Sequence, residues 1–331
     1  MRAVVLVGGL GTRLRPLTDT IPKPMLPVAH VPLIARLVAR LGAGGVDAVT
    51  LALGFQPEPF IEAFPDGRCG DVALDYAVEP EPLDTGGAIR FAARHAGIDE
   101  TFVVVNGDVL TDLDVGALTE AHRRGGALAT LHLIAVDDPS AYGVAELDDA
   151  GRVLRFVEKP APGTEPSTLV NAGTYVFEPA VLDRIPEGRR VSIERETFPA
   201  LVDDGGVHSL ATDDYWIDAG RPDEFLQANL DFLTGARAER VDGIHSDADV
   251  DPDAMISTSV ISAGATVAAG SVVTESVILP GATVGAGSTI ERSIVMGDVG
   301  NGAHVARTIV GASTSVPDGQ SLVDARLPAQ R

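Results

Sequence analysis

The last third of the chain repeats itself, and this repeat constrains the fold more than any other feature. Four triplets of a hydroxyl residue and two aliphatic residues follow one another at intervals of seventeen, seventeen and fifteen: Ser259–Ile261, Ser276–Ile278, Ser293–Val295 and Thr308–Val310. Within one unit, aliphatic residues lie six apart, as in Ile261, Val267 and Val273, with small residues between them. This hexapeptide spacing predicts a β-helix, in which each short strand buries one aliphatic side chain. Three such strands per coil account for the longer period.

The other end of the chain has a short apolar run that stops at glycines. Val4-Val5-Leu6-Val7 predicts a buried strand. Three glycines, a hydroxyl and three positive charges follow it: Gly8, Gly9, Gly11, Thr12, Arg13, Arg15 and Lys23. Glycine backbone approaches a ligand closely, and guanidinium groups bind phosphate oxygens. In a chain of net charge −22, this group predicts a site for an anion.

Two familiar phosphate loops do not fit this segment. A dinucleotide fingerprint needs a third glycine where Leu14 stands, and the Gly-Lys-Ser/Thr end of a Walker loop is absent. The remaining alternative from the residues alone is a glycine hairpin with solvated arginines.

Strands and helices alternate in the next part of the chain. A helix that opens at Pro32 and a strand over Val49–Leu53 predict a parallel βαβ unit with the first strand. A later apolar run, Phe102–Val105, ends at Asn106-Gly107-Asp108. Ligands of parallel sheets lie at the carboxyl ends of the strands. A carboxylate there suits Mg²⁺, although the same residues also suit a simple turn.

The stretch Gly8–Thr18 followed by Lys23-Pro24 resembles the signature of the sugar-1-phosphate nucleotidyltransferases, also called NDP-sugar pyrophosphorylases. Further motifs of that family occur in order: Gly107-Asp108, Tyr142-Gly143, Glu158-Lys159-Pro160, Asn171-Ala172-Gly173-Thr174-Tyr175 and Trp216-Ile217-Asp218. The segment Leu83–Ala88 corresponds to the family's loop at the nucleotide base, and it departs from the family pattern at Asp84 and Gly87. After the last motif, Arg221 replaces the family's threonine. The resemblance covers nearly the whole chain.

The resemblance implies roles for particular residues. The catalytic residues it implies are Arg13, Lys23 and Lys159, and the magnesium ligands are Asp108 and Asp218. The nucleotide-binding residues it implies are Leu6, Gly8, Gly9, Gly11, Thr12, Arg13, Glu79, Gly86, Asn106 and Gly107. The sugar-phosphate-binding residues it implies are Tyr142, Gly143, Glu158, Lys159, Asn171, Gly173 and Trp216.

The resemblance also implies the architecture. It predicts a Rossmann-like three-layer α/β/α nucleotidyltransferase domain with a mostly parallel, mixed sheet, followed by a smaller left-handed parallel β-helix. We expect the catalytic domain over residues 1–235, a linker over 236–245, the β-helix over 246–325 and a tail over 326–331.

Composition bounds the partners and the location. A pI near 4.5 argues against nucleic acid, and the single cysteine, Cys69, excludes an internal disulfide or a cysteine metal cage. No apolar stretch is long enough to cross a membrane, and the chain enters a strand at once, without a signal peptide. These features predict a cytoplasmic protein.

Residues 256–273 carry no charge, which predicts that the β-helix packs on another surface and that the chain forms a homo-oligomer.

The predicted reaction joins a nucleoside triphosphate to a sugar-1-phosphate and releases pyrophosphate. The motif forms and the β-helix together resemble the mannose-1-phosphate guanylyltransferases, with GTP and mannose-1-phosphate giving GDP-mannose. Glucose-1-phosphate thymidylyl- or uridylyltransferases are the alternatives within the family. A non-catalytic sugar-nucleotide-binding regulatory subunit is the alternative outside catalysis, but it should lack the charged groups that are all present here. Acyl transfer by the β-helix would need a placed histidine, and only His304 lies in the coils.

Overall fold

The computed structural model describes residues 1–9, 11–54, 57–237 and 239–328. Leu10 of the N-terminal motif and residues 329–331 of the predicted tail lie outside the described residues. The chain divides into two compact units, and each unit is formed by two segments that are separate in the sequence. The first unit comprises Met1–Gly9 and Ile34–Trp216, and the second comprises Leu10–Leu33 and Ile217–Arg331. No helix among the described residues has the length and apolarity that crossing a membrane requires.

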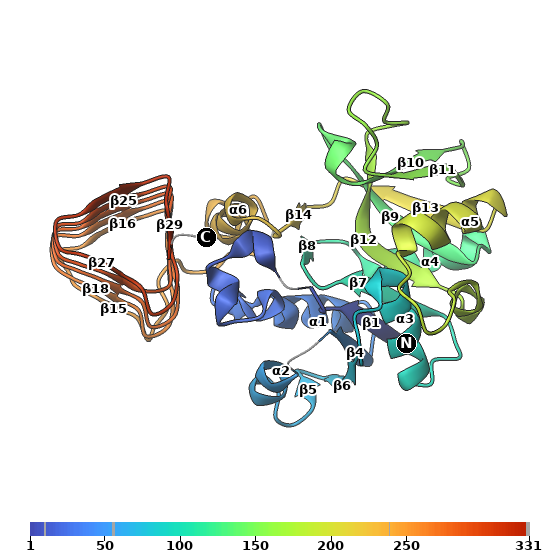
Figure 1. Ribbon diagram of the computed structural model, residues 1–331, viewed down its shortest axis with the longest axis horizontal. Helices are drawn as coiled ribbons and strands as arrows, with labels where there is room; N and C mark the ends of the chain where they lie inside the picture. Colours follow the sequence, from blue (N-terminus) through green and yellow to red (C-terminus); the bar gives the residue numbers. More distant parts are fainter. Residues whose placement is uncertain (10, 55–56, 238, 329–331) are drawn as a thin grey trace. The chain divides into compact units, whose positions relative to one another are not determined.

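The first unit is built on a mixed, mostly parallel sheet (Figure 1). Its strands follow the path β11-β10-β12-β7-β1-β4-β6-β5, with β9 beside β12 and β13 beside β9. Their bounds are β1 (Arg2–Leu6), β4 (Ala48–Leu53), β5 (Arg68–Cys69), β6 (Val72–Val78), β7 (Phe102–Asn106), β9 (Ala129–Ala135), β10 (Gly143–Leu147), β11 (Val153–Glu158), β12 (Leu169–Phe177) and β13 (Val207–Thr212). A separate short strand, β8 (Val109–Thr111), follows β7.

The parallel part of this sheet confirms the predicted βαβ unit. β1 lies between β4 and β7, parallel to both, with Val4 opposite Thr50 on one side and Val104 on the other. β4 in turn pairs in parallel with β6. The apolar runs of β1 and β7 are nearly continuous because strands buried on both faces leave no position for polar side chains. The carboxyl ends of β7, β1, β4 and β6 therefore meet at one edge of the sheet.

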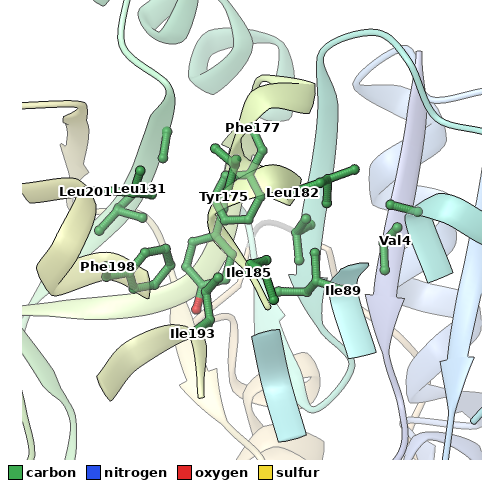
Figure 2. Close-up of a cluster of buried hydrophobic side chains, with 14 of the residues drawn as sticks. Val4, Ile89, Leu131, Tyr175, Phe177, Leu182, Ile185, Ile193, Phe198 and Leu201 are labelled. Atoms are coloured by element: carbon green, nitrogen blue, oxygen red, sulfur yellow. The ribbon is translucent and has the colours of Figure 1, made fainter. Parts of the chain in front are cut away.

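Helices cover both faces of the sheet. The α-helices of this part of the chain are α1 (Leu33–Ala43), α2 (Glu58–Ala63), α3 (Asp84–His95), α4 (Val115–Gly125) and α5 (Phe198–Asp203). Neighbouring residues of a strand point to opposite faces. Leu131 of β9 packs in a core cluster with Ile89 of α3 and Phe198 of α5 (Figure 2), whereas the hydroxyl of Thr130 contacts His122 of α4. The predicted three-layer arrangement is confirmed.

The second unit begins with a segment from the N-terminal motif. It contains the 3₁₀ turns η1 (Thr12–Leu14), η2 (Leu17–Asp19) and η3 (Lys23–Met25) and the hairpin of β2 (Pro27–Val28) and β3 (Val31–Pro32). The chain returns to this unit through β14 (Trp216–Asp218) and helix α6 (Pro222–Thr234). Pro222 stands at the first turn of α6, and Asp223 and Glu224 stabilise its N-terminus. Within this unit, the amide of Ala29 donates to Asn229 of α6 at 2.8 Å.

The rest of the second unit is a β-helix, visible in Figure 1 as stacked short strands. The strands of residues 249–327 form three parallel sheets. One sheet holds β15 (Asp249–Val250), β18 (Thr266–Val267), β21 (Thr283–Val284), β24 (Asp298–Val299) and β27 (Ser315–Val316). The next holds β16 (Met255–Ser257), β19 (Val272–Thr274), β22 (Thr289–Glu291), β25 (His304–Ala306) and β28 (Ser321–Val323). The last holds β17 (Val260–Ile261), β20 (Val277–Ile278), β23 (Ile294–Val295), β26 (Ile309–Val310) and β29 (Arg326–Leu327).

The register of the coils reproduces the sequence repeat. Val260 pairs with Val277 and Val277 with Ile294, seventeen residues apart, and Ile294 pairs with Ile309 after fifteen. The aliphatic residues at six-residue spacing, such as Ile261, Val267 and Val273, are buried in one core cluster. The arrangement is consistent with the predicted left-handed β-helix.

Candidate active site

Glycines at the carboxyl edge of the first unit let neighbouring backbones touch. A Cβ at Gly8, after β1, would lie 3.0 Å from the amide nitrogen of Gly54, after β4. A Cβ at Gly107, after β7, would lie 2.6 Å from the carbonyl oxygen of Leu6, to which the Gly107 amide donates at 2.8 Å. Larger residues at Gly8 or Gly107 would force these loops apart. Of the predicted nucleotide residues, this edge brings together Leu6, Gly8, Gly9, Asn106 and Gly107.

A buried carboxylate stands at the same edge. Glu79 follows β6 and is only 8% exposed. Its Oε2 accepts the amide of Leu83 at 2.8 Å, and its Oε1 lies 3.6 Å from where a Cβ at Gly8 would be. Burial raises the pKa of Glu79, and the nearby Asp84 carboxylate adds to the rise, while the Leu83 hydrogen bond opposes it. The absent side chain at Gly8 therefore leaves space beside a carboxylate oxygen in a poorly solvated place.

Two asparagines predicted as site residues lie at β7 and β12: Asn106 at the end of β7 approaches β12, and Asn171 forms hydrogen bonds within β12. A Cβ at Gly173, whose φ is +77°, would lie 2.9 Å from the side-chain amide of Asn106. Asn171 accepts the amide of Gly173 at 3.0 Å and donates to the hydroxyl of Tyr175 at 2.8 Å. Complete burial raises the pKa of Tyr175 well above its usual range, so it stays a neutral partner. Asp108 follows Gly107 in the short connection between β7 and β8.

Glu158 ends β11 beside Gly143 of β10, and Lys159 follows it. The Lys159 ammonium lies 3.3 Å from Oε1 of Glu158, and a Cβ at Gly143 would lie 2.9 Å from Oε2 of Glu158. Burial raises the pKa of Glu158, and the Lys159 charge partly offsets the rise. Lys159 has a φ of +48°, an unusual backbone conformation for a side chain of this size, and its amide donates to the carbonyl of Tyr142. The backbone therefore fixes the direction in which Lys159 leaves the sheet.

An aromatic pair borders this group. The rings of Tyr142 and Trp216 meet edge to face, with centroids 5.5 Å apart. The indole of Trp216 donates to the carbonyl of Ala172 at 2.9 Å, between the predicted residues Asn171 and Gly173. All the predicted sugar-phosphate residues therefore lie on neighbouring elements of the first unit.

Three charged side chains gather around one glycine in the second unit. Lys23, with a side chain only 8% exposed, has its ammonium 3.7 Å from Oδ1 of Asp218. A Cβ at Gly220 would lie 2.7 Å from the same oxygen, 2.9 Å from a terminal nitrogen of Arg13 and 3.2 Å from the Lys23 ammonium. Gly220 therefore makes room for two cations and an anion to meet. Gly220 lies two residues after the Trp216-Ile217-Asp218 motif, but nothing in the sequence shows which side chains need that space.

The loop that carries Arg13 is closed by its own hydrogen bonds. Gly11 has a φ of +59° and precedes η1, and its carbonyl accepts both the amide of Leu14 and the hydroxyl of Thr18. A side chain at Gly11 would be strained and would lie 2.9 Å from Thr18. Thr12 begins η1 directly before Arg13.

At the start of α3, the predicted nucleotide residue Gly86 and its neighbour Thr85 form hydrogen bonds with other parts of the protein. The amide of Gly86 donates to the carbonyl of Val191 at 2.8 Å, and the hydroxyl of Thr85 donates to Glu194 at 2.7 Å. Ser192 donates to the same Glu194 oxygen. This glycine thus serves close packing with residues 191–194, and its nucleotide contact stays a prediction. Glu194 was not expected from the sequence, because its partner Thr85 lies 109 positions earlier in the chain.

The two predicted metal ligands offer oxygen donors suited to a hard cation. Among the described residues, no group of three or more His, Cys, Asp or Glu side chains forms a metal site of its own. Mg²⁺ is commonly held by one or two carboxylates together with waters and substrate phosphate oxygens. Asp108 belongs to the first unit and Asp218 to the second, and each carries a carboxylate of the kind that Mg²⁺ prefers; their role as magnesium ligands stays a prediction.

Two family models match consecutive parts of the chain. The nucleotidyl transferase family matches residues 2–235, and the GMPPB C-terminal domain matches residues 241–328. The chain therefore belongs to the nucleotidyl transferase family.

Individual proteins of known name and one solved structure are also similar to this chain. Mannose-1-phosphate guanylyltransferase of Mycobacterium tuberculosis is 42% identical over 282 residues, which are 81% of this chain and 77% of that protein. Mannose-1-phosphate guanyltransferase of Aspergillus oryzae is 40% identical over 238 residues, 71% of this chain and 65% of that protein. The crystal structure of HddC from Yersinia pseudotuberculosis complexed with GMP-PN has a TM-score of 0.60 at 30% identity, and the match covers 70% of this chain and 99% of HddC.

Proposed function

We propose that this protein transfers a guanylyl group from GTP to mannose-1-phosphate, giving GDP-mannose and pyrophosphate. The observation that carries the reaction type is the meeting of Arg13, Lys23 and Asp218 around Gly220. The choice of GTP and mannose-1-phosphate is supported by the two relatives named above, at 42% and 40% identity. Because the chain spans 65% of the second relative, the activity of the whole protein is carried over only as part of this proposal.

The chemistry asks the protein mainly to hold and neutralise charge. An oxygen of the sugar phosphate attacks the α-phosphorus of the nucleotide in line, the new P–O bond forms, and the bond to pyrophosphate breaks. In such phosphoryl transfers, positioning and electrostatic stabilisation supply most of the rate. Arg13 and Lys23 would stabilise the triphosphate and the departing pyrophosphate. Lys159, directed by its backbone conformation, would hold the attacking phosphate.

Asp108 and Asp218 would hold Mg²⁺ when the nucleotide is bound. The ion would neutralise phosphate charge and orient the phosphates for attack. The carboxylate of Asp218 is already beside Lys23, so Lys23 limits the excess negative charge on this residue when no nucleotide is bound.

Glu79 supports guanine among the possible bases. Guanine presents two neighbouring donors, N1–H and the N2 amino group, and one carboxylate can accept both. Thymine and uracil offer one N–H flanked by two carbonyl oxygens, which a carboxylate would repel. The open side of the Glu79 carboxylate, next to Gly8, lies at the strand edge where the base and ribose would bind.

On the sugar side, Glu158 and Asn171 would accept or donate hydrogen bonds to sugar hydroxyls. The edge of the Tyr142 and Trp216 pair would give the ring an apolar wall. The raised pKa of Glu158 reflects a carboxylate with few water contacts, which favours hydrogen bonds from a bound sugar.

A substrate screen tests this proposal. GTP, ATP, UTP, CTP and dTTP are each combined with mannose-1-phosphate or glucose-1-phosphate in the presence of Mg²⁺, and pyrophosphate release is measured. We expect GTP with mannose-1-phosphate to give the highest kcat/KM. The Glu79→Gln variant should lose preference for GTP, whereas Glu81→Gln, an exposed neighbour, should keep it.

The other outcomes identify the alternatives. Highest activity with dTTP or UTP and glucose-1-phosphate would show that base and sugar are assigned wrongly. Binding of GDP-mannose with no pyrophosphate release from any pair would show a regulatory sugar-nucleotide-binding protein instead of an enzyme.

A further inference from the structure

The last coil of the β-helix contacts the loop that carries Arg13, and both belong to the second compact unit. Arg326 lies on β29, more than three hundred positions after this loop. Its guanidinium nitrogen Nη1 donates to the carbonyl of Arg13 at 3.3 Å and to the carbonyl of Arg15 at 3.4 Å. One side chain of the β-helix therefore spans the end of the 3₁₀ turn η1.

A second contact joins the same two segments. Gly311 follows β26, and a Cβ there would lie 2.8 Å from both Cβ and Cγ of Pro16, and 2.9 Å from the carbonyl of Leu327. The backbone of Gly311 does not have a positive φ, so lack of space, rather than conformation, demands glycine here. Two separate positions of the β-helix thus fit against residues 13–16.

The turn η1 needs this support because it is short. Its own backbone bonds run from Leu14 to Gly11 and from Arg15 to Thr12. The carbonyls at the end of such a turn have no partner within it. Within the described part of the chain, Arg326 is the donor that the carbonyls of Arg13 and Arg15 share.

The two ends of Arg13 therefore have different anchors. Its carbonyl is held by Arg326, and its guanidinium lies beside the space at Gly220, with Lys23 and Asp218. Since one residue carries both groups, a shift of the backbone moves the guanidinium as well.

We propose that Arg326 is a positioning residue for the transfer reaction: the β-helix fixes the backbone at Arg13 and, through it, the direction of the Arg13 guanidinium. This inference rests on the proposed function. It makes the terminal coil part of the machinery for turnover, separate from the strand-end loops of the first unit that are proposed to bind the nucleotide.

Kinetics of Arg326→Ala test the inference. A small misplacement of a charged group costs transition-state stabilisation more than ground-state binding. We expect kcat to fall roughly ten- to a hundredfold, with little change in the KM for GTP. In the reverse reaction, the KM for pyrophosphate should rise, while the KM for GDP-mannose stays the same. Arg326→Lys keeps a donor at this place and should recover part of kcat.

A matched control and a double variant distinguish an effect of Arg326 on the position of Arg13 from a general loss of structure in the β-helix. Arg292→Ala removes an exposed arginine of the same β-helix, which pairs with Glu275 and not with the loop, and should leave kcat unchanged. If Arg326 acts through Arg13, adding Arg326→Ala to Arg13→Ala should cause little further loss. Full additivity of the two losses in kcat would overturn the inference, as would a normal kcat in Arg326→Ala.

Hydrogen exchange gives a readout that does not depend on activity. The amides of Leu14 and Arg15, which close η1, should exchange faster in Arg326→Ala than in the wild type. The amides of β7 should exchange at the same rate in both. If the wild type shows no transfer activity, the proposed function fails, and exchange alone decides whether Arg326 holds the loop. Unchanged exchange at Leu14 and Arg15 would then overturn the inference.

Discussion

At the scale of single residues, the guanidinium of Arg13 shares a small space with one cation and one anion. Charge there matters most when negative charge builds up on the departing pyrophosphate. We expect Arg13→Ala to lower kcat more than it weakens GTP binding, measured as a dissociation constant by calorimetry alongside steady-state kinetics. Arg123→Ala is the control, because this exposed arginine pairs with Glu120 on helix α4 and has no predicted role in the site. A change in KM alone would make Arg13 a ground-state anchor.

The two aspartates give a second residue-scale prediction. Asp108→Asn and Asp218→Asn each keep the shape of the side chain but remove the charge that would hold Mg²⁺. Electrostatic stabilisation at such sites is worth several kcal/mol, so each variant should lose nearly all magnesium-dependent turnover while its melting temperature stays close to that of the wild type. Asp114→Asn is the control, since Asp114 caps α4 and asparagine is an equally good cap. Near-normal activity in either variant removes that residue from the metal site.

His132 predicts how stability depends on pH. It lies fully buried in β9, with Nε2 2.8 Å from the hydroxyl of Thr212. Burial lowers the pKa of His132 from 6.5 to about 4. The unfolded chain therefore binds this proton more readily, so the contribution to stability is complete above pH 6.5 and is lost as pH falls toward 4. At pH 5 the free energy of unfolding should be about 2 kcal/mol lower from this residue alone.

Denaturant unfolding of His132→Gln between pH 7 and pH 5 measures this contribution. The variant has no titrating ring, so its stability should fall less over this range than that of the wild type. Parallel pH dependence in the two proteins would show that His132 does not titrate with a depressed pKa.

At the scale of elements, hydroxyl groups connect successive coils of the β-helix. Ser276 accepts the amide of Ser293 at 3.1 Å and donates to the carbonyl of Thr274 at 2.7 Å, and it is fully buried. Ser259 accepts the amide of Ser276 in the same way. Ser276→Ala leaves a buried amide without its acceptor, which costs about 1–3 kcal/mol.

Thermal or urea unfolding checks this ladder. Ser276→Ala should lower the melting temperature, whereas Ser315→Ala, at an exposed position of β27, should not. Ser276→Thr should be tolerated, because Thr308 holds the equivalent place in a later coil and accepts the amide of Ala325. Equal effects at Ser276 and Ser315 would mean that the ladder contributes nothing.

Elements that follow a local pattern could be predicted from the sequence. The β-helix register is contained in the spacing of its serine triplets, and the strand that ends at Asn106 is contained in its apolar run. The grouping of Arg13, Lys23 and Asp218 around Gly220 depends on packing between segments about two hundred positions apart, which no local pattern encodes. The contact of Arg326 with the loop is hidden for the same reason. Gly86 is the opposite case: the sequence motif predicts a nucleotide contact, and in the structure its amide donates a hydrogen bond to the carbonyl of Val191.

At the scale of the whole molecule, the uneven distribution of charge predicts assembly. The chain has a net charge of −22, yet residues 256–273 carry no charged side chain. Met255 and Val323, on the two end strands of one β-helix sheet, are 62% and 46% exposed. End strands also present unpaired backbone groups that can pair with another chain. We propose that the end of the β-helix that carries Met255 and the charge-free residues 256–273 is covered by a second copy of the chain in a homo-oligomer.

Sedimentation velocity over a wide concentration range tests assembly. We expect the full-length protein to be oligomeric and a form truncated near Gly243 to be monomeric, soluble and able to bind GTP. The truncated form should turn over slowly, because it also lacks Arg326. Full-length Arg326→Ala separates these two effects, since it should remain oligomeric while its kcat falls. A full-length protein that stays monomeric at every concentration would exclude assembly through the β-helix, and the exposed Met255 would then belong to a free end of the coil.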